Sequence, residues 1–177
     1  MNLIVAVDSK WGIGYKGDLL FKFPEDMRRF IEITKQHGIV VMGRKTFESL
    51  KKPDGLPERI NWVITRDPVK FKEKYPSNNV LAFGTIQEVI SAYVKNRDEK
   101  NGTDVICIGG AEIYKELLPY CKKAFVTKIN LNICNCDAYF PEDLDRSEHW
   151  RPNFISSTIK LEEDVRLTFW NYVRVGE

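Results

Sequence analysis

The stretch Ile106-Cys107-Ile108-Gly109-Gly110-Ala111-Glu112-Ile113-Tyr114 combines a strand, a turn and a helix. The apolar run over 104–108 predicts a buried strand, and the residues after the two glycines predict a helix over 111–118, which Pro119 ends. A buried strand that passes through glycine into a helix is typical of open α/β sheets, which bind ligands at the carboxyl ends of their strands. We therefore expect an α/β fold with a ligand near this turn.

Short apolar runs alternate with helical patterns on both sides of this stretch. Strands are predicted at 3–7, 39–42, 60–65, 80–83, 123–129, 155–160 and 167–175, and helices from 24 to about 35 and behind a capping box at 85–88. This alternation favours a doubly wound, mainly parallel sheet, and 177 residues fit a single domain. Because no helix separates the last two strands, we expect them to form an antiparallel C-terminal edge hairpin.

Composition excludes several classes of protein. The 27 basic and 25 acidic residues leave a net charge of +2, which argues against a dedicated nucleic-acid binder. The sequence contains no apolar stretch of about 18 residues that could span a membrane. The start of the chain carries no basic region of the kind that opens a signal peptide. We expect a cytoplasmic monomer.

Four cysteines stand at Cys107, Cys121, Cys134 and Cys136. Without an export signal, reduced thiols are expected rather than disulfides. The pair at 134 and 136 could be half of a metal site, but the sequence has only two histidines and no second cysteine pair. A structural zinc site usually needs four such ligands, so we expect two incidental thiols and no metal.

A glycine motif follows the first strand. Residues 12–17, Gly12-Ile13-Gly14-Tyr15-Lys16-Gly17, match the dinucleotide pattern G-x-G-x-x-G. In a Rossmann fold that loop enters a helix directly, whereas here the helix begins only at Pro24. The acidic residue that should follow about twenty positions later is also missing. A long glycine-containing loop over a pocket is the favoured interpretation.

Phosphate-binding features follow other strands. The strand at 39–42 ends in Gly43-Arg44-Lys45-Thr46, which offers glycine, positive charge and a hydroxyl at a helix start. Thr65-Arg66 ends the strand at 60–65, and Gly109-Gly110 ends the strand at 104–108. A solvated helix start and packing glycines would explain each turn separately. Together the turns favour an extended, phosphate-bearing ligand.

Asp26 is the candidate acid–base residue. It lies in the first turn of the helix that begins at Pro24, beside the apolar residues Met27 and Phe30. These neighbours favour a carboxylate that faces a hydrophobic cleft. Acidic residues are also common at helix starts as partners of the helix dipole, and that structural role stays open for Asp26.

Taken in order, these segments resemble the dihydrofolate reductase family from 3 to about 175. The resemblance rests on Ala6, Trp11-Gly12-Ile13-Gly14, Phe23-Pro24-Glu25-Asp26-Met27, Met42-Gly43-Arg44-Lys45-Thr46-Phe47-Glu48-Ser49, Pro53, Leu56, Pro57, Arg59, Ile108-Gly109-Gly110-Ala111-Glu112-Ile113-Tyr114, Thr127 and Asp137-Ala138-Tyr139-Phe140-Pro141. Each motif is weak alone, whereas the ordered set is specific.

The resemblance implies reduction of dihydrofolate to tetrahydrofolate, with NADPH as the hydride donor. It implies that Asp26 pairs with the pterin and promotes protonation of N5, and that Thr127 hydrogen-bonds to Asp26 or, through water, to the pterin. Arg59 is implied to bind the carboxylate of the glutamate tail, which suits a planar guanidinium. The family also has a cis bond between Gly109 and Gly110.

The resemblance assigns the remaining site residues to two ligands. The substrate pocket is implied to contain Ile4, Ala6, Leu19, Met27, Phe30, Leu50, Leu56 and Ile108. The cofactor site is implied to contain Ala6, Ile13, Gly14, Gly43, Arg44, Lys45, Thr46, Thr65, Arg66, Gly109, Gly110, Ala111, Glu112, Ile113 and Tyr114.

Two departures from the family pattern stand out. Leu20-Phe21 replaces the usual Pro-Trp, so an indole donor near the pterin is missing, and the spacing near Cys134–Asp137 is a residue longer. Two alternatives to the reductase also remain. One is the riboflavin-pathway reductase, which shares the fold and acts on a ribosylamino pyrimidine. The other is a nucleotide-binding regulator without turnover, which an intact Asp26 argues against.

Overall fold

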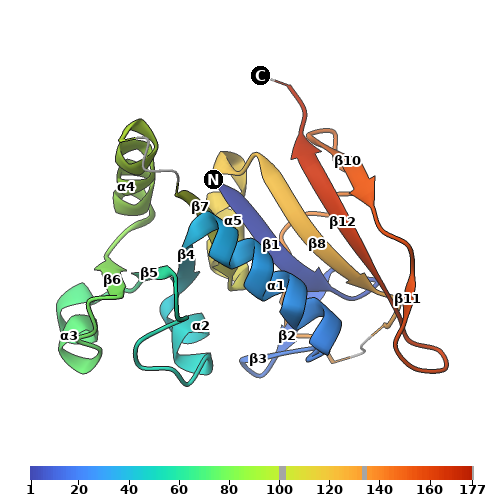
Figure 1. Ribbon diagram of the computed structural model, residues 1–177, viewed down its shortest axis with the longest axis horizontal. Coiled ribbons are helices and arrows are strands. Elements are labelled where there is room, and N and C mark those ends of the chain that lie inside the picture. Colours follow the sequence, from blue (N-terminus) through green and yellow to red (C-terminus); the bar gives the residue numbers. More distant parts are fainter. Residues whose placement is uncertain (100–102, 133–134, 177) are drawn as a thin grey trace.

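The computed structural model describes residues 1–99, 103–132 and 135–176. Its main sheet runs in the order β10 (Trp150–Ile155), β12 (Arg166–Arg174), β8 (Lys123–Ile129), β1 (Asn2–Val7), β7 (Asp104–Gly109), β4 (Gly38–Gly43), β5 (Ile60–Ile64) and β6 (Val80–Phe83), with β11 (Ile159–Lys160) paired to β12 (Figure 1). The strands from β8 to β6 pair in parallel, and β10, β11 and β12 pair antiparallel. The predicted fold class is confirmed.

Helices cover both faces of this sheet. They are α1 (Pro24–His37), α2 (Arg44–Ser49), α3 (Pro68–Lys74), α4 (Ile86–Asp98), α5 (Ala111–Leu117) and the short 3₁₀ helix η1 (Leu118–Tyr120). In Figure 1, α1 crosses in front of the sheet and α5 lies behind it. Side chains of β1 alternate between two cores, with Leu3 and Val5 packed beside α4 and α5 and Ile4 packed beside α1 and α2. Burial on both faces explains why the central strands are continuous apolar runs.

The signals at helix ends act largely as predicted. Pro24 occupies the first turn of α1, and the helix ends at Gly38, whose φ of 85° is a left-handed conformation that glycine adopts easily. At the start of α4 the Thr85 hydroxyl accepts a hydrogen bond from the Glu88 amide. Glu88 in turn accepts one from the Gly84 amide, one residue before the position that a standard capping box uses.

The glycine motif folds as a hairpin. Residues 12–17 form β2 (Gly12–Tyr15) and a turn, and β3 (Asp18–Leu19) and β9 (Ala138–Tyr139) pair with β2 on either side. Lys16 and Gly17 both have positive φ, at 49° and 78°, which is the pattern of a type I′ hairpin turn. The prediction of a long loop is therefore wrong for Gly12–Tyr15 and Asp18–Leu19, which pair as strands, whereas the rejection of a Rossmann turn is correct.

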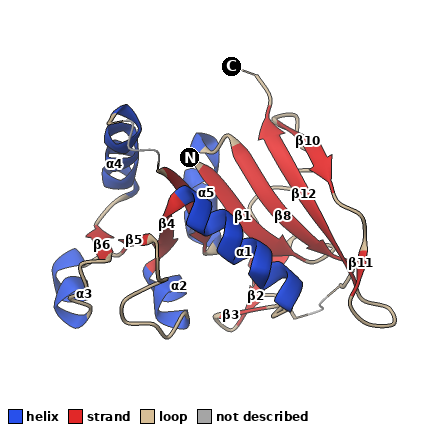
Figure 2. Ribbon diagram, in the orientation of Figure 1, coloured by secondary structure: helices blue, strands red, loops and turns tan. Residues whose placement is uncertain are grey.

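The C-terminal edge differs in detail from its prediction. The strand predicted at 155–160 is wrong as one strand, because β10 already begins at Trp150 and ends at Ile155, and only Ile159–Lys160 resumes pairing as β11. Ser156 interrupts the strand, since its hydroxyl accepts from the Phe169 amide and donates to the Ser157 carbonyl. Strand β10 forms the outer edge of the sheet, and β12 lies between β10 and β8 (Figure 2).

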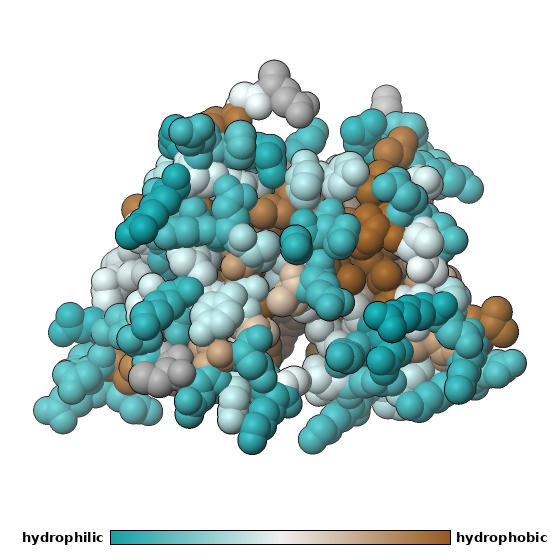
Figure 3. All heavy atoms as spheres, turned by 180° about the vertical axis from the view of Figure 1, so that it is seen from behind, coloured by the Kyte–Doolittle hydropathy of each residue, from teal (hydrophilic) through white to brown (hydrophobic). Residues whose placement is uncertain are grey.

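The surface agrees with the composition. The face opposite to that of Figure 1 is mainly hydrophilic (Figure 3), and the mean hydropathy of the chain is −0.34. Within the described residues, no helix is long and apolar enough to cross a membrane.

Candidate active site

Asp26 and Thr127 lie together between α1 and β8. Asp26 is half-buried in the first turn of α1, and Thr127 on β8 is almost completely buried. Burial raises the pKa of the Asp26 carboxyl, while a hydrogen-bonding interaction with the Thr127 hydroxyl and the positive charge of Arg29 lower it. The net direction is upward, so this carboxyl takes up a proton more readily than an exposed aspartate.

Sequence reasoning missed Arg29. This residue lies three positions after Asp26 and donates from Nη1 to the Thr127 hydroxyl over 3.4 Å. The i, i+3 spacing places residues 26 and 29 on one face of a helix, but it does not show which strand side chains Arg29 meets. An arginine on a helix is usually solvated, so the spacing alone does not single it out.

Apolar side chains that are predicted for the substrate pocket pack together between α1, α2 and the main sheet. Ile4 and Leu56 are buried, and Phe30, Leu50 and Ile108 pack against the same cluster. Ala6 on β1 is half-buried and lies opposite Thr127 in the register of β1 and β8. Two other predicted residues, Leu19 on β3 and Met27 on α1, are 63% and 43% exposed, so they border solvent instead of the packed cluster.

The loop between α2 and β5 carries Arg59. Its Nε donates to the Pro57 carbonyl over 2.8 Å, and Nη1 donates to the Thr34 hydroxyl of α1 over 2.9 Å. Behind the loop, the buried Asn61 accepts from the Leu56 amide and donates to the carbonyls of Leu56 and Arg59. One carboxamide therefore fixes the loop that presents Arg59 at the apolar cluster.

Asn61→Ala should lower the free energy of unfolding by about 1–3 kcal/mol, because it leaves buried backbone groups without partners. Urea unfolding followed by circular dichroism measures this change. Asn78→Ala, at an exposed turn residue, is the matched control and should change the free energy by less than about 0.5 kcal/mol. Equal stability of the two variants would show that the carboxamide does not hold the loop.

A second group of predicted residues lines a cleft of about 1060 Å³ at the carboxyl ends of β4, β5 and β7. The cleft contains Gly43, Arg44, Lys45, Thr46, Thr65, Arg66, Gly110, Ala111, Glu112 and Ile113, all predicted for the cofactor. It also contains Lys70 and Lys74 of α3, which sequence reasoning missed because no helix was predicted there.

The charges in this cleft are unevenly neutralised. Arg44 pairs with Glu48 at 2.7 Å, and Lys74 approaches the same carboxylate at 3.6 Å. Lys45, Arg66 and Lys70 make no ion pair with any residue that the structure describes. The cleft thus offers these three cations to an anionic ligand, although the carboxylates of Asp67, Glu112 and Asp137 also line it.

Five residues predicted for the cofactor do not line this cleft. Ala6 lies on β1, Ile13 and Gly14 lie on β2, and Gly109 ends β7. Tyr114 is buried, and its hydroxyl donates to the Ile4 carbonyl over 2.7 Å, so it joins α5 to β1. The Gly109–Gly110 bond is cis, as predicted. Gly109 has a φ of 109°, and a Cβ there would lie 2.9 Å from the Tyr114 ring, so the position requires glycine.

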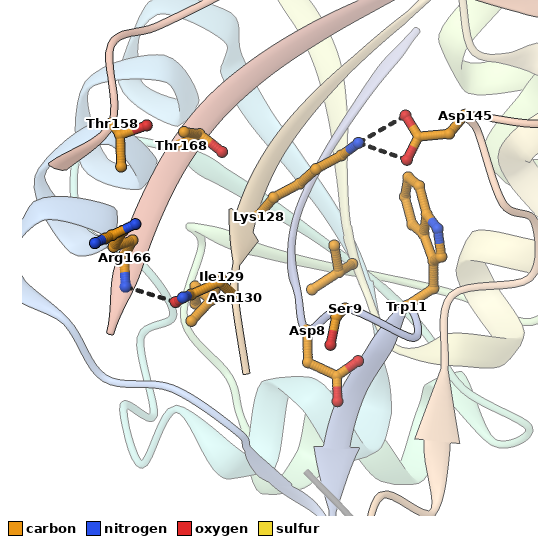
Figure 4. Close-up of a pocket in the computed structure, with 11 residues that line it drawn as sticks. Asp8, Ser9, Trp11, Lys128, Ile129, Asn130, Asp145, Thr158, Arg166 and Thr168 are labelled. Carbon is orange, nitrogen blue, oxygen red and sulfur yellow. Dashed lines mark hydrogen bonds and ion pairs between the residues drawn. The ribbon is translucent and has the colours of Figure 1, made fainter. Parts of the chain in front are cut away.

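A smaller cavity of about 370 Å³ lies at the ends of β1 and β8 and contains none of the predicted site residues (Figure 4). The Lys128 ammonium pairs with Asp145 at 2.6 Å and lies 3.8 Å from the ring centre of Trp170. The positive charge of Lys128 is therefore already neutralised by the protein.

The thiols show no sign of a metal centre in the described part of the chain. Cys107 and Cys121 are buried and unpaired, and Cys136 lies 3.7 Å from an Asp8 carboxylate oxygen. Burial raises the pKa of the Cys121 thiol to about 12, which keeps it protonated. Across 1–99, 103–132 and 135–176, no group of three or more His, Cys, Asp or Glu could hold a metal ion. Cys134 lies outside the described residues.

Comparison with known proteins settles the family. A family profile described as dihydrofolate reductase matches residues 1–174. The chain belongs to the dihydrofolate reductase family. It is 36% identical over 142 residues to the dihydrofolate reductase of Buchnera aphidicola, covering 80% of this chain and 79% of that protein. It is 33% identical over 142 residues to that of Bacillus subtilis, covering 80% and 76%.

A solved structure agrees with this membership. Dihydrofolate reductase from Enterococcus faecalis, complexed with NADP(H) and RAB-propyl, superposes with a TM-score of 0.78 at 27% identity and covers 98% of this chain and 95% of that one. The resemblance found in the motifs is thus confirmed. So are the fold class and the assignment to enzymes that reduce dihydrofolate with NADPH.

Proposed function

We propose that this reductase binds dihydrofolate against the apolar cluster and NADPH in the cleft at the carboxyl ends of β4, β5 and β7, with Asp26 as its acid–base residue. The observation that carries the proposal is a half-buried carboxylate on α1, one turn before Phe30, which packs with Ile108 against the apolar cluster that contains Ile4. Loss of NADPH absorbance with dihydrofolate, and none without it, is the direct test of the activity.

The residues of the cleft fit NADPH. Glycine stands where the backbone is approached closely, since a Cβ on Gly43 would lie 3.1 Å from Ile113 and one on Gly110 would lie 3.4 Å from Thr46. Lys45, Arg66 and Lys70 supply positive charge for phosphate groups. When bound, NADPH supplies the hydride that the reduction requires. The protein supplies the charged walls of the cleft and the apolar cluster beside it.

The protein controls the proton of the reaction. A carboxylate at Asp26 can accept the parallel N–H groups of the pterin amidine edge, and the Thr127 hydroxyl favours this charged form. Because burial raises the pKa of Asp26, the pocket retains a proton nearer to neutral pH than an exposed aspartate would. Asp26 therefore fixes the pterin tautomer, and water can deliver the proton to N5.

We expect Arg66 to bind the adenosine 2′-phosphate, which NADPH carries and NADH lacks. Arg66→Ala should therefore raise the KM for NADPH about ten- to a hundredfold and hardly change the KM for NADH, because a hydrogen bond to a charged group contributes roughly 1.5–3 kcal/mol. Arg44→Ala should have a smaller effect, since Arg44 already pairs with Glu48. Steady-state kinetics with both cofactors measure these changes. Arg146→Ala, at an exposed position outside the cleft, is the control. If both cofactors weaken equally, Arg66 does not contact the 2′-phosphate.

Two alternatives are separated by the same assay. A reductase of the riboflavin pathway would consume NADPH with a ribosylamino pyrimidine and not with dihydrofolate, and a regulator would bind NADPH without turnover. Asp26 and Arg59 favour the folate, since Asp26 lies in the first turn of α1 and Arg59 donates to Thr34 near the other end of that helix. We also propose that the protein acts as a cytoplasmic monomer.

A further inference from the structure

Arg29 reaches from α1 onto the sheet beside the catalytic carboxylate. Its Nη2 donates to the Asn171 side-chain oxygen over 2.6 Å and to the Trp170 carbonyl over 3.4 Å, both on β12. Its Nη1 donates to the Thr127 hydroxyl on β8 over 3.4 Å. Two strands therefore fix one guanidinium group.

Strand alternation explains how the sheet receives this group. Thr127 pairs with Phe169 and Phe125 pairs with Asn171 across β8 and β12, so these four side chains share the face toward α1. The guanidinium lies 4.5 Å from the ring centre of Phe169 and 5.9 Å from that of Phe125. Aromatic faces attract such a cation and also keep water from it.

Arg29 keeps its charge in this setting. Burial lowers the pKa of its guanidinium to about 10, and the charge of Asp26 opposes that change. Near neutral pH the group is therefore cationic. Because it is shielded from water, its field acts on neighbouring groups more strongly than that of a solvated arginine.

Few other groups act on Asp26. Glu25, the preceding residue on α1, pairs with Arg28 at 3.8 Å, and Arg28 is 74% exposed. From α5, the Tyr114 hydroxyl donates a hydrogen bond to the Ile4 carbonyl, and burial raises the pKa of Tyr114 well above the usual value, so it stays neutral. From β8, Thr127 contributes a hydroxyl and no charge. Among the described residues, Arg29 is the cation whose charge acts on Asp26.

We propose that Arg29 is a positioning residue that holds Asp26 in its carboxylate form, by its charge and through Thr127, and so limits the pH range of dihydrofolate reduction. The hydroxyl of Thr127 accepts from Arg29, which leaves its own proton free to donate to Asp26. Such chains strengthen each hydrogen bond by polarisation. The inference rests on the proposed role of Asp26 as the acid–base residue.

The direction of the effect follows from the charges. Burial raises the pKa of Asp26, and Arg29 and Thr127 bring it part of the way back down. Without Arg29 the pKa should rise further, and the pocket should keep its proton to higher pH. Since the reaction consumes a proton, the pH at which hydride transfer declines should then move upward.

The experiment replaces Arg29 and follows two signals. Arg29→Met keeps the apolar stem, and Arg29→Gln keeps a donor for Asn171 in case the first variant does not fold. Carbon NMR of labelled aspartate, assigned with Asp26→Asn, reports the titration of Asp26, and single-turnover mixing reports hydride transfer against pH. The midpoint of the Asp26 titration and the midpoint of the pH dependence of hydride transfer should both move to higher pH in Arg29→Met and in Arg29→Gln. Arg29→Lys should stay near the wild type, and Arg28→Met should leave both midpoints unchanged.

The two signals separate two failures. An Asp26 titration that does not move in Arg29→Gln would overturn the inference, whatever the activity does. A titration that moves while the pH dependence of hydride transfer stays fixed would uphold the effect of Arg29 on Asp26. That second result would instead refute the proposed role of Asp26, and with it the effect of Arg29 on catalysis.

Discussion

Asp26→Asn should lower turnover near neutral pH by about 10²–10⁴-fold, the usual contribution of general acid–base assistance. Asparagine keeps the shape of the side chain and removes the ionisable group. Asp26 is the one half-buried acid beside the apolar cluster, in the described part of the chain, whose pKa burial raises. Steady-state turnover with saturating NADPH and dihydrofolate measures the loss.

The pH dependence of Asp26→Asn tests whether the carboxyl assists protonation of the substrate. Activity of Asp26→Asn should partly recover as the pH falls, because substrate that is protonated in solution no longer needs the carboxyl. The affinity for NADPH should hardly change, since Asp26 does not line the cleft that we assign to the cofactor. Glu25→Gln, which removes the neighbouring carboxylate paired with Arg28, should keep nearly full turnover. A pH–rate profile of Asp26→Asn equal in height and shape to that of the wild type would refute this role.

The main sheet could be predicted because its central strands are buried on both faces. The runs around Val40, Val63 and Ile106 are continuous and apolar, and each is followed by a turn that starts a helix. The predicted strand at 39–42 and the observed Gly38–Gly43 differ by one residue at each end. Such strands need no long-range information, since their own composition reports their burial.

The unpredicted elements are short, or their partners lie far away in the sequence. Helix α3 has seven residues, of which Phe71 is buried, so it has no apolar periodicity to detect. Its start could be read in the sequence, because Asp67 precedes Pro68 there. In the structure Asp67 caps the helix by accepting a hydrogen bond from the Lys70 amide. The small sheet joins Gly12 to Tyr139, and that pairing depends on how the whole chain folds.

The candidate site likewise has one part that the sequence predicts and another part that it does not. Positions at the carboxyl ends of the strands could be predicted, because the topology of an open α/β sheet brings such ends together. The contribution of Arg29 could not, since it depends on which side chains of β8 and β12 meet α1. The exposure of Leu19 and Met27 has a physical meaning, because large apolar side chains at the border of a pocket are often covered by a ligand.

Arg59→Ala should weaken the use of dihydrofolate about 10²–10³-fold in kcat/KM, because truncating one partner of a hydrogen-bonded charge pair costs roughly 2–5 kcal/mol. The protein uses the Nε and one Nη1 donor of Arg59 for Pro57 and Thr34. The remaining N–H groups are available to a carboxylate of the glutamate tail.

A tail-less dihydropterin is the comparison that makes this prediction specific. Arg59 is 4% exposed, so its removal also disturbs packing, and a loss with one substrate alone would not separate the two causes. We expect kcat/KM for the dihydropterin to stay nearly unchanged. Arg59→Lys should restore little, because an ammonium lacks the planar fork of a guanidinium. Lys35→Ala removes a nearby exposed charge, which pairs with Glu58, and should affect neither substrate. If Arg59→Ala impairs both substrates alike, Arg59 supports the loop and does not bind the tail.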